Sequence, residues 1–238
     1  MVSKYKTPNK SYLLKTDKFI CNRFGLAEFF TQYYSEFECE RGQLVLDAGC
    51  GALPLGIFFA DQFQCKVIGV ELNPIACQCA EYNIIKNSLS DRIEVFNEDF
   101  VTFSKRYEGE KFDLIVANPP VNDKITKEDV LRYSDFTYEK LDDKSFSFLT
   151  NSWHSAEGKD LIDYIFEFGM TGLKADGRII IVFCTIDCDS PKYVYNKAEK
   201  NGYRIMRVVD GYVSSSSIGA ETLGIMDINT IMVEFRRR

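Results

Sequence analysis

The stretch that decides the fold is Val45-Leu46-Asp47-Ala48-Gly49-Cys50-Gly51, and Pro54 follows it three residues later. An apolar run that ends in an acidic residue and two glycines is typical of a strand that turns sharply into a helix. Glycine suits such a turn because the backbone can come close to a ligand without a Cβ in the way. The stretch therefore predicts a strand, a glycine turn and a helix around a nucleotide-like ligand.

Seven apolar runs rich in β-forming residues predict seven strands. They are Leu44–Leu46, Lys66–Val70, Ile93–Phe96, Phe112–Ala117, Arg178–Phe183, Tyr203–Val209 and Thr230–Phe235. Helices are predicted at Pro54–Gln62, Pro74–Ser88 and Asp160–Leu173, with Gly177 near the exit of the last. Strands that alternate with helices pair in parallel, whereas the helix-free connection Asp210–Asn229 predicts an antiparallel closing pair. We expect an α/β fold with a doubly wound seven-stranded sheet, Rossmann-like and mostly parallel, with an antiparallel last strand.

The overall composition is that of one globular unit. The chain has 238 residues, of which 45% are hydrophobic and 27% charged, so disordered and fibrous classes are excluded. It has no apolar run of the ~18 to 20 residues that would span a bilayer, and residues 1–18 lack a secretion signal. We therefore expect no membrane partner and a cytoplasmic location. We further expect an N-terminal extension at residues 1–30, packed near a cofactor or acceptor site, and a main domain at residues 31–238.

The cysteines and the charges exclude two further classes. Eight cysteines have spacings that fit neither a zinc site nor a disulfide scaffold, so free buried thiols and no metal are expected. The net charge of −6 argues against a protein that coats nucleic acid through its overall charge. Two local basic patches are nevertheless candidates for binding RNA. They are Lys4, Lys6, Lys10, Lys15 and Lys18 beside Tyr5 and Tyr12, and the run Arg236–Arg238.

The alternative for both patches is a solvated, partly disordered terminus. We favour that alternative for the arginines, whereas the lysine patch stays open between the two.

The glycine turn separates two classes of nucleotide site. A dinucleotide fingerprint, G-x-G-x-x-G, would place its third glycine at position 54, which is Pro54. The stretch instead resembles the first motif of the class I S-adenosylmethionine-dependent methyltransferases. The resemblance implies that Asp47 holds the methionine end of the cofactor and that the turn Gly49–Gly51 passes beneath it. Many members of that family have a further glycine where this chain has Leu53.

The next two strands end in residues that fit the same resemblance. Glu71 and Leu72 follow the second strand, and a carboxylate there can accept hydrogen bonds from both ribose hydroxyls, in dinucleotide and methyl-donor sites alike. Asp99 and Phe100 follow the third strand and resemble the family segment in which an acidic residue receives the adenine amine and an apolar neighbour lies on the ring. Without the resemblance, Asp99 would be interpreted as a helix cap or turn residue.

The fourth strand runs into Asn118-Pro119-Pro120, which resembles the Asn-Pro-Pro-aromatic motif of methyltransferases that modify base amines or glutamine amides. Such nitrogens are poor nucleophiles because their lone pairs are delocalised. The Asn118 side-chain oxygen and the Pro119 carbonyl could accept their N–H bonds and orient the lone pair, with the proline rings fixing the carbonyl direction. Asn118 is also expected among the residues that contact the cofactor. Otherwise the motif only ends the strand. The aromatic is Val121 here, and Tyr138 or Trp153 from the long polar connection 122–158 could replace it.

Two branches of the family share these motifs. Leu14-Lys15-Thr16-Asp17 and Phe24-Gly25-Leu26 resemble the entry segment of small-domain RNA adenine and guanine N-methyltransferases. Ser155–Ile162 resembles a stretch of the release-factor glutamine methyltransferases. The leading hypothesis is methyl transfer from S-adenosylmethionine, with S-adenosylhomocysteine as product, to an RNA base amine or a protein amide. Alternatives are a small-molecule amine as acceptor, or an inactive methyltransferase-like binding protein.

Overall fold

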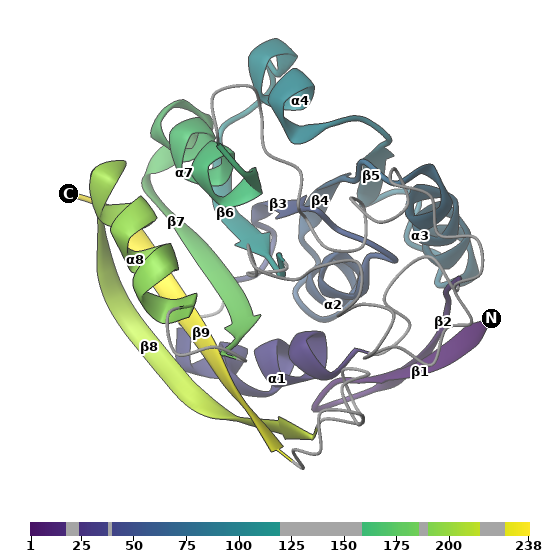
Figure 1. Ribbon diagram of the computed structural model, residues 1–238. Helices are drawn as coiled ribbons and strands as arrows, with labels where there is room; N and C mark the ends of the chain where they lie inside the picture. Colours follow the sequence, from purple (N-terminus) through teal and green to yellow (C-terminus); the bar gives the residue numbers. More distant parts are fainter. Residues whose placement is uncertain (18–23, 38–39, 120–158, 186–189, 215–226) are drawn as a thin grey trace, which may run out of the picture.

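The computed structural model describes residues 1–17, 24–37, 40–119, 159–185, 190–214 and 227–238. Its main sheet has seven strands in the order β5-β4-β3-β6-β7-β9-β8 (Figure 1). These are β3 (Leu44–Ala48), β4 (Lys66–Val70), β5 (Ile93–Phe96), β6 (Phe112–Ala117), β7 (Leu173–Cys184), β8 (Tyr203–Ser214) and β9 (Asp227–Arg237). The first five pair in parallel, and β9 runs antiparallel between β7 and β8. The predicted fold class is confirmed.

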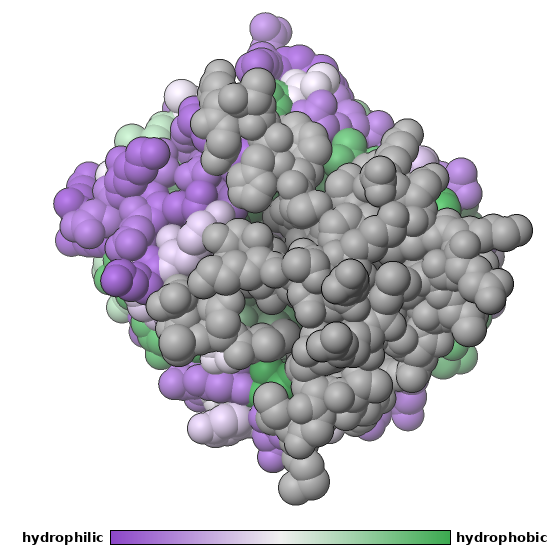
Figure 2. All heavy atoms as spheres, in the orientation of Figure 1, coloured by the Kyte–Doolittle hydropathy of each residue, from purple (hydrophilic) through white to green (hydrophobic). Residues whose placement is uncertain are grey.

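Helices cover both faces of the sheet. One face packs on α1 (Gly25–Tyr33), the short 3-10 helix η1 (Tyr34–Phe37), α2 (Pro54–Gln62) and α3 (Pro74–Lys86). The other face packs on α4 (Phe100–Arg106), α7 (Leu161–Gly172) and α8 (Ser190–Lys200). Alternate residues of β3 enter the two cores, Val45 on the first side and Leu46 on the second, as the two-residue period of a strand requires. Hydrophilic residues cover the surface over α7 and α8 (Figure 2).

The helices α4 and α8 carried no clear sequence signal. Among residues 191–200 of α8, only Val194 and Ala198 are buried, four residues apart, so its buried stripe is narrow. The helix α4 has seven residues, too few to show a period. The boundary predicted at residue 30 lies inside α1, whose Phe29 packs against Gly211 of β8.

The closing strands are longer than predicted. The connection expected from Asp210 to Asn229 begins only after Ser214 and ends before Asp227. As an edge strand β8 exposes most of its residues, and a register shift lies between Ile205 and Arg207. Its second half alternates, with Val209 and Val213 buried and Asp210 and Tyr212 exposed, but the apolar pattern is short because Gly211 lies between the two valines.

The C-terminal arginines are not a disordered terminus, and that expectation is wrong. Arg236 belongs to β9 and its Nε donates to Glu234 at 2.8 Å. The Arg237 guanidinium donates to main-chain oxygens of Met170 and Lys174, and that of Arg238 donates to Glu199 at 2.9 Å. These bonds tie the end of β9 to α7, the start of β7 and α8.

The basic N-terminal segment is ordered as well. Strands β1 (Val2–Lys6) and β2 (Ser11–Lys15) form an antiparallel hairpin that lies beside α2 and α3 (Figure 1). Tyr5, Tyr12 and Leu14 point inward and are buried, and the ring of Tyr5 stacks on that of Tyr12. Since the hairpin has its own apolar face, the partly disordered alternative is wrong for residues 1–15.

Within the described ranges, no helix has the length and apolarity needed to cross a membrane.

Candidate functional site

The sheet register brings the predicted cofactor residues to one edge. Asp47 pairs with Val116 of β6, and Asn118 follows two residues later. Val70, the residue before Glu71, pairs with Ala48 on one side and Phe96 on the other. Since all four strands are parallel, their carboxyl ends place Asp47, Glu71, Asp99 and Asn118 along the same edge. Ligands of open α/β sheets bind at this edge.

Asp47 is a buried carboxylate at the end of β3. Its side chain is 2% exposed, and its Oδ2 accepts the backbone N–H of Gly56 in α2 at 2.9 Å. Burial raises the pKa of Asp47, the bond from the Gly56 N–H lowers it and the nearby Glu71 carboxylate raises it, and together these effects bring it to about 7. The group is thus poised between its neutral and charged forms near neutral pH, so a cationic partner would favour the charge.

The glycine turn contains three left-handed residues. Gly49 and Gly51 have φ of 70° and 55°, and Leu53, the N-cap of α2, has φ of 69°. The N–H groups of Gly49 and Cys50 both donate to the Val70 carbonyl, at 2.9 and 3.1 Å. Leu53 occupies the position where the resembling family often has glycine, and its conformation is the one that glycine adopts freely.

The left-handed backbone of Leu53 is compensated by its side chain, which is fully buried. A Cβ added at Gly56 or Gly69 would lie 2.7 or 3.0 Å from the Leu53 Cδ1 atom. The two glycines therefore leave the space that Leu53 fills between α2 and β4. Burying a leucine side chain contributes about 1.5 to 3 kcal/mol, which offsets a left-handed cost of about 1 to 3 kcal/mol.

Glu71 fastens the turn to the end of β4. Its Oε2 accepts the Gly51 N–H and its Oε1 accepts the Asn73 N–H, each at 2.8 Å. Burial raises its pKa, and these N–H groups oppose the rise. The Asn97 side-chain amide donates to the main-chain oxygens of Glu71 and Leu72, at 2.9 and 3.2 Å. Leu72 is 39% exposed. The ends of β4 and β5 are thus cross-linked beside the turn.

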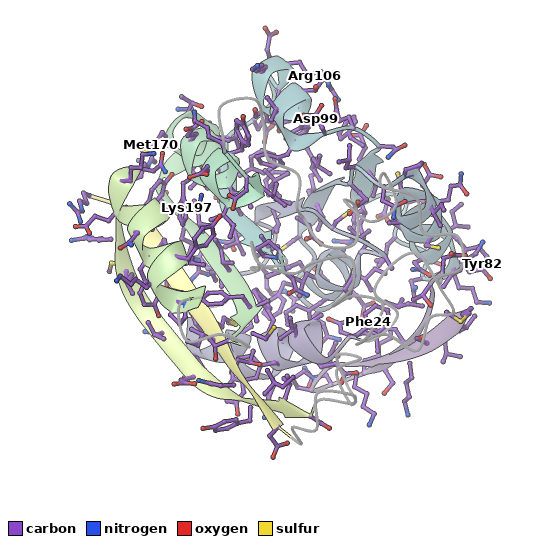
Figure 3. The ribbon with its side chains drawn as sticks, in the orientation of Figure 1. Phe24, Tyr82, Asp99, Arg106, Met170 and Lys197 are labelled. Atoms are coloured by element: carbon purple, nitrogen blue, oxygen red, sulfur yellow. The ribbon has the colours of Figure 1, made fainter. Side chains whose placement is uncertain are left out.

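Asp99 is the N-cap of α4, as its interpretation without the family resemblance predicted (Figure 3). Its Oδ1 accepts the Thr102 N–H at 3.0 Å, and its Oδ2 accepts the Thr102 hydroxyl at 2.6 Å. Phe100 is buried, with its ring edge-to-face against Phe168 at 5.8 Å. Contacts of Asp99 and Phe100 with an adenine ring stay a prediction.

Only part of the predicted acceptor motif is described. Asn118 is half-buried and Pro119 is buried directly after β6. Beside them, Leu161 at the start of α7 approaches the turn, because a Cβ on Gly49 would lie 3.1 Å from its Cδ2. The residues Pro120, Val121, Tyr138 and Trp153 lie outside the described ranges, as does the whole connection 122–158.

Asn83 of α3 is a residue that the sequence interpretation missed. Its fully buried amide accepts the Lys15 N–H at 2.6 Å and donates to the oxygens of Lys15 and Ala52, each at 3.0 Å. It therefore joins the N-terminal hairpin to the residue that follows the glycine turn. The sequence does contain a signal for this role. Asn83 continues the buried stripe that Ala76 and Ala80 form along α3, and a polar side chain in a buried stripe needs hydrogen-bond partners.

A second missed group lies at the start of α7. Asp160 and Asp163 form a capping box in which each side chain accepts the other residue's N–H. The Lys197 ammonium of α8 lies 3.4 Å from Asp160 and 2.5 Å from Asp163, and the Tyr193 hydroxyl donates to Asp160. This buried polar group fixes α8 against the beginning of α7, close to the glycine turn.

Four buried cysteines of the described residues are free thiols. Cys50, Cys65, Cys77 and Cys79 are buried and free, and burial raises the pKa of each. A raised pKa keeps a thiol protonated and poorly nucleophilic. Among the residues that the structure describes, no group of three histidine, cysteine or acidic side chains could hold a metal.

Residues 31–138 match the family described as the methyltransferase small domain. The matched range begins inside α1 and continues beyond β6. It contains Asp47, Glu71, Asp99 and Asn118, so the family match covers all four strand ends that the register brings together.

Curated relatives match over a shorter stretch. The chain is 38% identical over 81 residues to the tRNA1(Val) (adenine(37)-N6)-methyltransferase of Porphyromonas gingivalis, covering 33% of this chain and 32% of that protein. It is 40% identical over 78 residues to the Haemophilus influenzae protein of the same description, covering 32% and 33%. An uncharacterized RNA methyltransferase of Chlamydia pneumoniae is 40% identical over 82 residues, covering 34% and 20%. The match spans about a third or less of each relative's length.

Solved structures agree with almost the whole chain. A methyltransferase from Pyrococcus furiosus superposes with a TM-score of 0.60 at 12% identity, covering 94% of this chain and 89% of that one. The precorrin-6y C5,15-methyltransferase from Geobacter metallireducens gives 0.58 at 12% identity, covering 94% of both. At these identities the likeness shows the fold alone, which is that of the Rossmann-like class I methyltransferases.

Proposed function

We propose that the protein transfers a methyl group from S-adenosylmethionine to a nitrogen atom, on the basis that residues 31–138 match the family described as the methyltransferase small domain. We propose an exocyclic amine of an RNA base as the acceptor. The relatives from Porphyromonas gingivalis and Haemophilus influenzae are both described as tRNA adenine-N6 methyltransferases, which supports RNA over protein. A side-chain amide of a protein and a small-molecule amine are the competing acceptors.

The observation that carries the cofactor assignment is the convergence of Asp47, the glycine turn and Glu71 at one sheet edge. The turn has an open side, because a Cβ at Gly51 would meet no atom within 4 Å. An anionic Asp47 would hold the ammonium of the methionine end, and Glu71 would accept the ribose hydroxyls. Leu72 and, by the family resemblance, Asp99 and Phe100 would surround the adenine. When bound, the cofactor supplies an electrophilic methyl on a sulfonium.

The acceptor nitrogen would be oriented from the end of β6. The Asn118 side-chain oxygen and the Pro119 carbonyl would accept its two N–H bonds, so that its lone pair points along the line of methyl transfer. The same two acceptors stabilise the positive charge that grows on nitrogen. The nitrogen then keeps its protons until after transfer, and no strong base is required before attack. Pro120 would fix the direction of the preceding carbonyl.

Two experiments test the function. Calorimetric titration with S-adenosylhomocysteine tests the cofactor site, and absence of binding at millimolar ligand would contradict it. Transfer of labelled methyl into tRNA, rRNA, a protein extract and a pool of amine metabolites then identifies the acceptor. We expect label on a base nitrogen of RNA. Label confined to protein or metabolites would replace the RNA acceptor, and label on oxygen or carbon would contradict nitrogen.

The substitution Asn118→Ala tests the orienting role. Loss of one preorganised hydrogen-bond partner at a reacting centre lowers kcat by about 10²- to 10³-fold, so a fall of that size is expected at saturating cofactor. The control is Asn201→Ala, which removes an amide that donates to the Lys197 oxygen, away from the sheet edge. Equal turnover of Asn118→Ala and wild type would show that Asn118 does not orient the acceptor.

A further inference from the structure

The outer face of the N-terminal hairpin is basic. Lys4 and Lys6 of β1 and Lys15 of β2 are exposed on the side opposite the buried tyrosines. The neighbouring α3 adds Tyr82, which is 46% exposed, and the exposed Lys86 one turn further along. These five residues are called the lysine face below. Tyr82 points away from the body of the protein beside the hairpin (Figure 3).

The lysine face is a positively charged surface on a protein whose net charge is negative. Residues 1–18 contain five of the chain's 29 basic residues but one of its 35 acidic residues. The remaining chain therefore has a clear excess of acidic side chains. Such an asymmetry concentrates positive potential on the hairpin and would orient a polyanion toward it.

The ammonium groups of the lysine face form no ion pairs with the described residues. Over the described residues, Lys4, Lys6, Lys15 and Lys86 have no ion pair, whereas Lys10 in the hairpin turn is paired with Asp61 at 3.0 Å. The Lys15 ammonium lies 4.9 Å from the centre of the Tyr82 ring. A cation beside a half-exposed aromatic ring offers both a phosphate contact and a stacking surface.

Exposed lysines also protect edge strands from aggregation, and that role alone would require no fixed position. This hairpin is held firmly instead. Tyr12 donates to Asp61 at 2.6 Å at one end, and at the other end Asn83 bonds both the N–H and the oxygen of Lys15. Because Asn83 also bonds the Ala52 oxygen, the Lys15 end of the face is fixed relative to the glycine turn.

We propose that the lysine face binds the sugar–phosphate backbone of the RNA acceptor. The lysines contact phosphates, and Tyr82 stacks on an unpaired base. Lys4 and Lys6 lie two residues apart on one strand, about 6.7 Å, so they form a row of charge that follows a strand of phosphates. The inference rests on the proposed RNA acceptor, and it adds the surface that positions the RNA.

The test is a triple substitution, Lys4→Gln, Lys6→Gln and Lys15→Gln. Its matched control is Lys105→Gln, Lys192→Gln and Lys200→Gln, which removes the same charge from exposed lysines of α4 and α8. Binding of fluorescently labelled bulk tRNA is measured by anisotropy between 50 and 200 mM salt. With about 0.7 to 0.9 counterions released per phosphate contact, three lost contacts should lower the slope of log Kd against log salt by about 2.

We expect the lysine-face variant to bind tRNA at least ~10-fold more weakly at 100 mM salt, and the control to change less than about twofold. Three phosphate contacts justify a change of that size. Binding of S-adenosylhomocysteine and the circular dichroism spectrum should be unchanged in both. The loss should appear in KM for RNA, with kcat retained at saturating RNA. A separate Tyr82→Ala variant should weaken binding without changing the salt slope.

The outcomes distinguish the inference from the proposed function. If wild type binds and methylates RNA but the two triple variants bind it with equal affinity, the proposal that the lysine face binds RNA is wrong, whereas the proposed RNA acceptor is supported. If wild type neither binds nor methylates RNA while it methylates a protein or a metabolite, both the proposed RNA acceptor and the proposed RNA-binding role of the lysine face are wrong.

Discussion

The substitution Asp47→Asn should stabilise the protein while it weakens cofactor binding. Asp47 is buried and its pKa is raised from 3.8 to about 7. A carboxyl whose pKa is raised on folding binds its proton more tightly in the folded state than in the unfolded chain. Its ionisation therefore lowers the free energy of unfolding as pH rises from about 4 to about 7, and the loss is complete above that.

The size of the effect follows from the shift. Each pKa unit corresponds to about 1.4 kcal/mol, so a rise of about three units costs the wild type about 4 kcal/mol above pH 7. Asparagine avoids this cost and its amide oxygen can still accept the Gly56 N–H, although a neutral acceptor is weaker by about 1 kcal/mol. We therefore expect the variant to be more stable by about 2 to 3 kcal/mol at pH 8.

Urea unfolding followed by circular dichroism at pH 4.5, 6 and 8 measures the difference. The stabilisation should be small at pH 4.5, grow up to about pH 7 and then level off. The control Asp91→Asn removes a carboxylate whose side chain is 73% exposed and should show no such trend. A variant less stable than wild type at pH 8, or a difference that does not depend on pH, would refute the reasoning.

Cofactor binding should respond in the opposite direction. An ionised Asp47 attracts the ammonium of S-adenosylhomocysteine, so wild-type affinity should rise with pH up to about 7. The variant should bind at least ~10-fold more weakly at pH 8, since a hydrogen bond to a charged group contributes about 1.5 to 3 kcal/mol. Equal affinities of the two proteins would show that Asp47 does not contact the ligand.

Two further predictions concern the turn and the cap. Leu53→Gly, which introduces the glycine common in the resembling family, should lower stability by about 1 to 2 kcal/mol, because loss of the buried side chain with the cavity it leaves costs about 2 to 5 kcal/mol and relief of the left-handed backbone returns about 1 to 3 kcal/mol. Thermal unfolding measures this, and unchanged stability would show that the packing of Leu53 contributes nothing. Asp99→Ala should cost about 1 kcal/mol through loss of the α4 cap, and Asp99→Ser should restore most of it. If S-adenosylhomocysteine binds equally well to the serine and wild-type forms, Asp99 acts only as a cap.

The sequence predicted the part of the fold that depends on continuous apolar strands. The strands β3, β4, β6 and the second half of β7 contribute apolar residues to both cores, so their apolar runs are visible without knowledge of their neighbours. The helices α2 and α3 were located from Pro54 and Pro74, each of which occupies a first helical turn. Elements with few buried apolar residues, such as α8 and the second half of β8, carry only a short pattern of this kind.

The same distinction applies to the candidate site. The positions of Asp47 and Glu71 were predicted because each follows a buried strand, and parallel register then brings them together. The partners of Asn83 could not be predicted, since they are main-chain atoms of residues 31 and 68 positions away. The left-handed conformation of Leu53 could not be predicted from the sequence either, because only the space beside Gly56 and Gly69 makes it favourable.

The position of β9 has a consequence for synthesis of the protein. The strand is the latest of the sheet to leave the ribosome, yet it lies between β7 and β8 and is the strand with which β8 pairs. A nascent chain that has reached Ser214 therefore exposes the open edges of two 12-residue strands, β7 and β8, until residues 227–237 emerge. Unpaired strand edges of this kind favour aggregation during that interval.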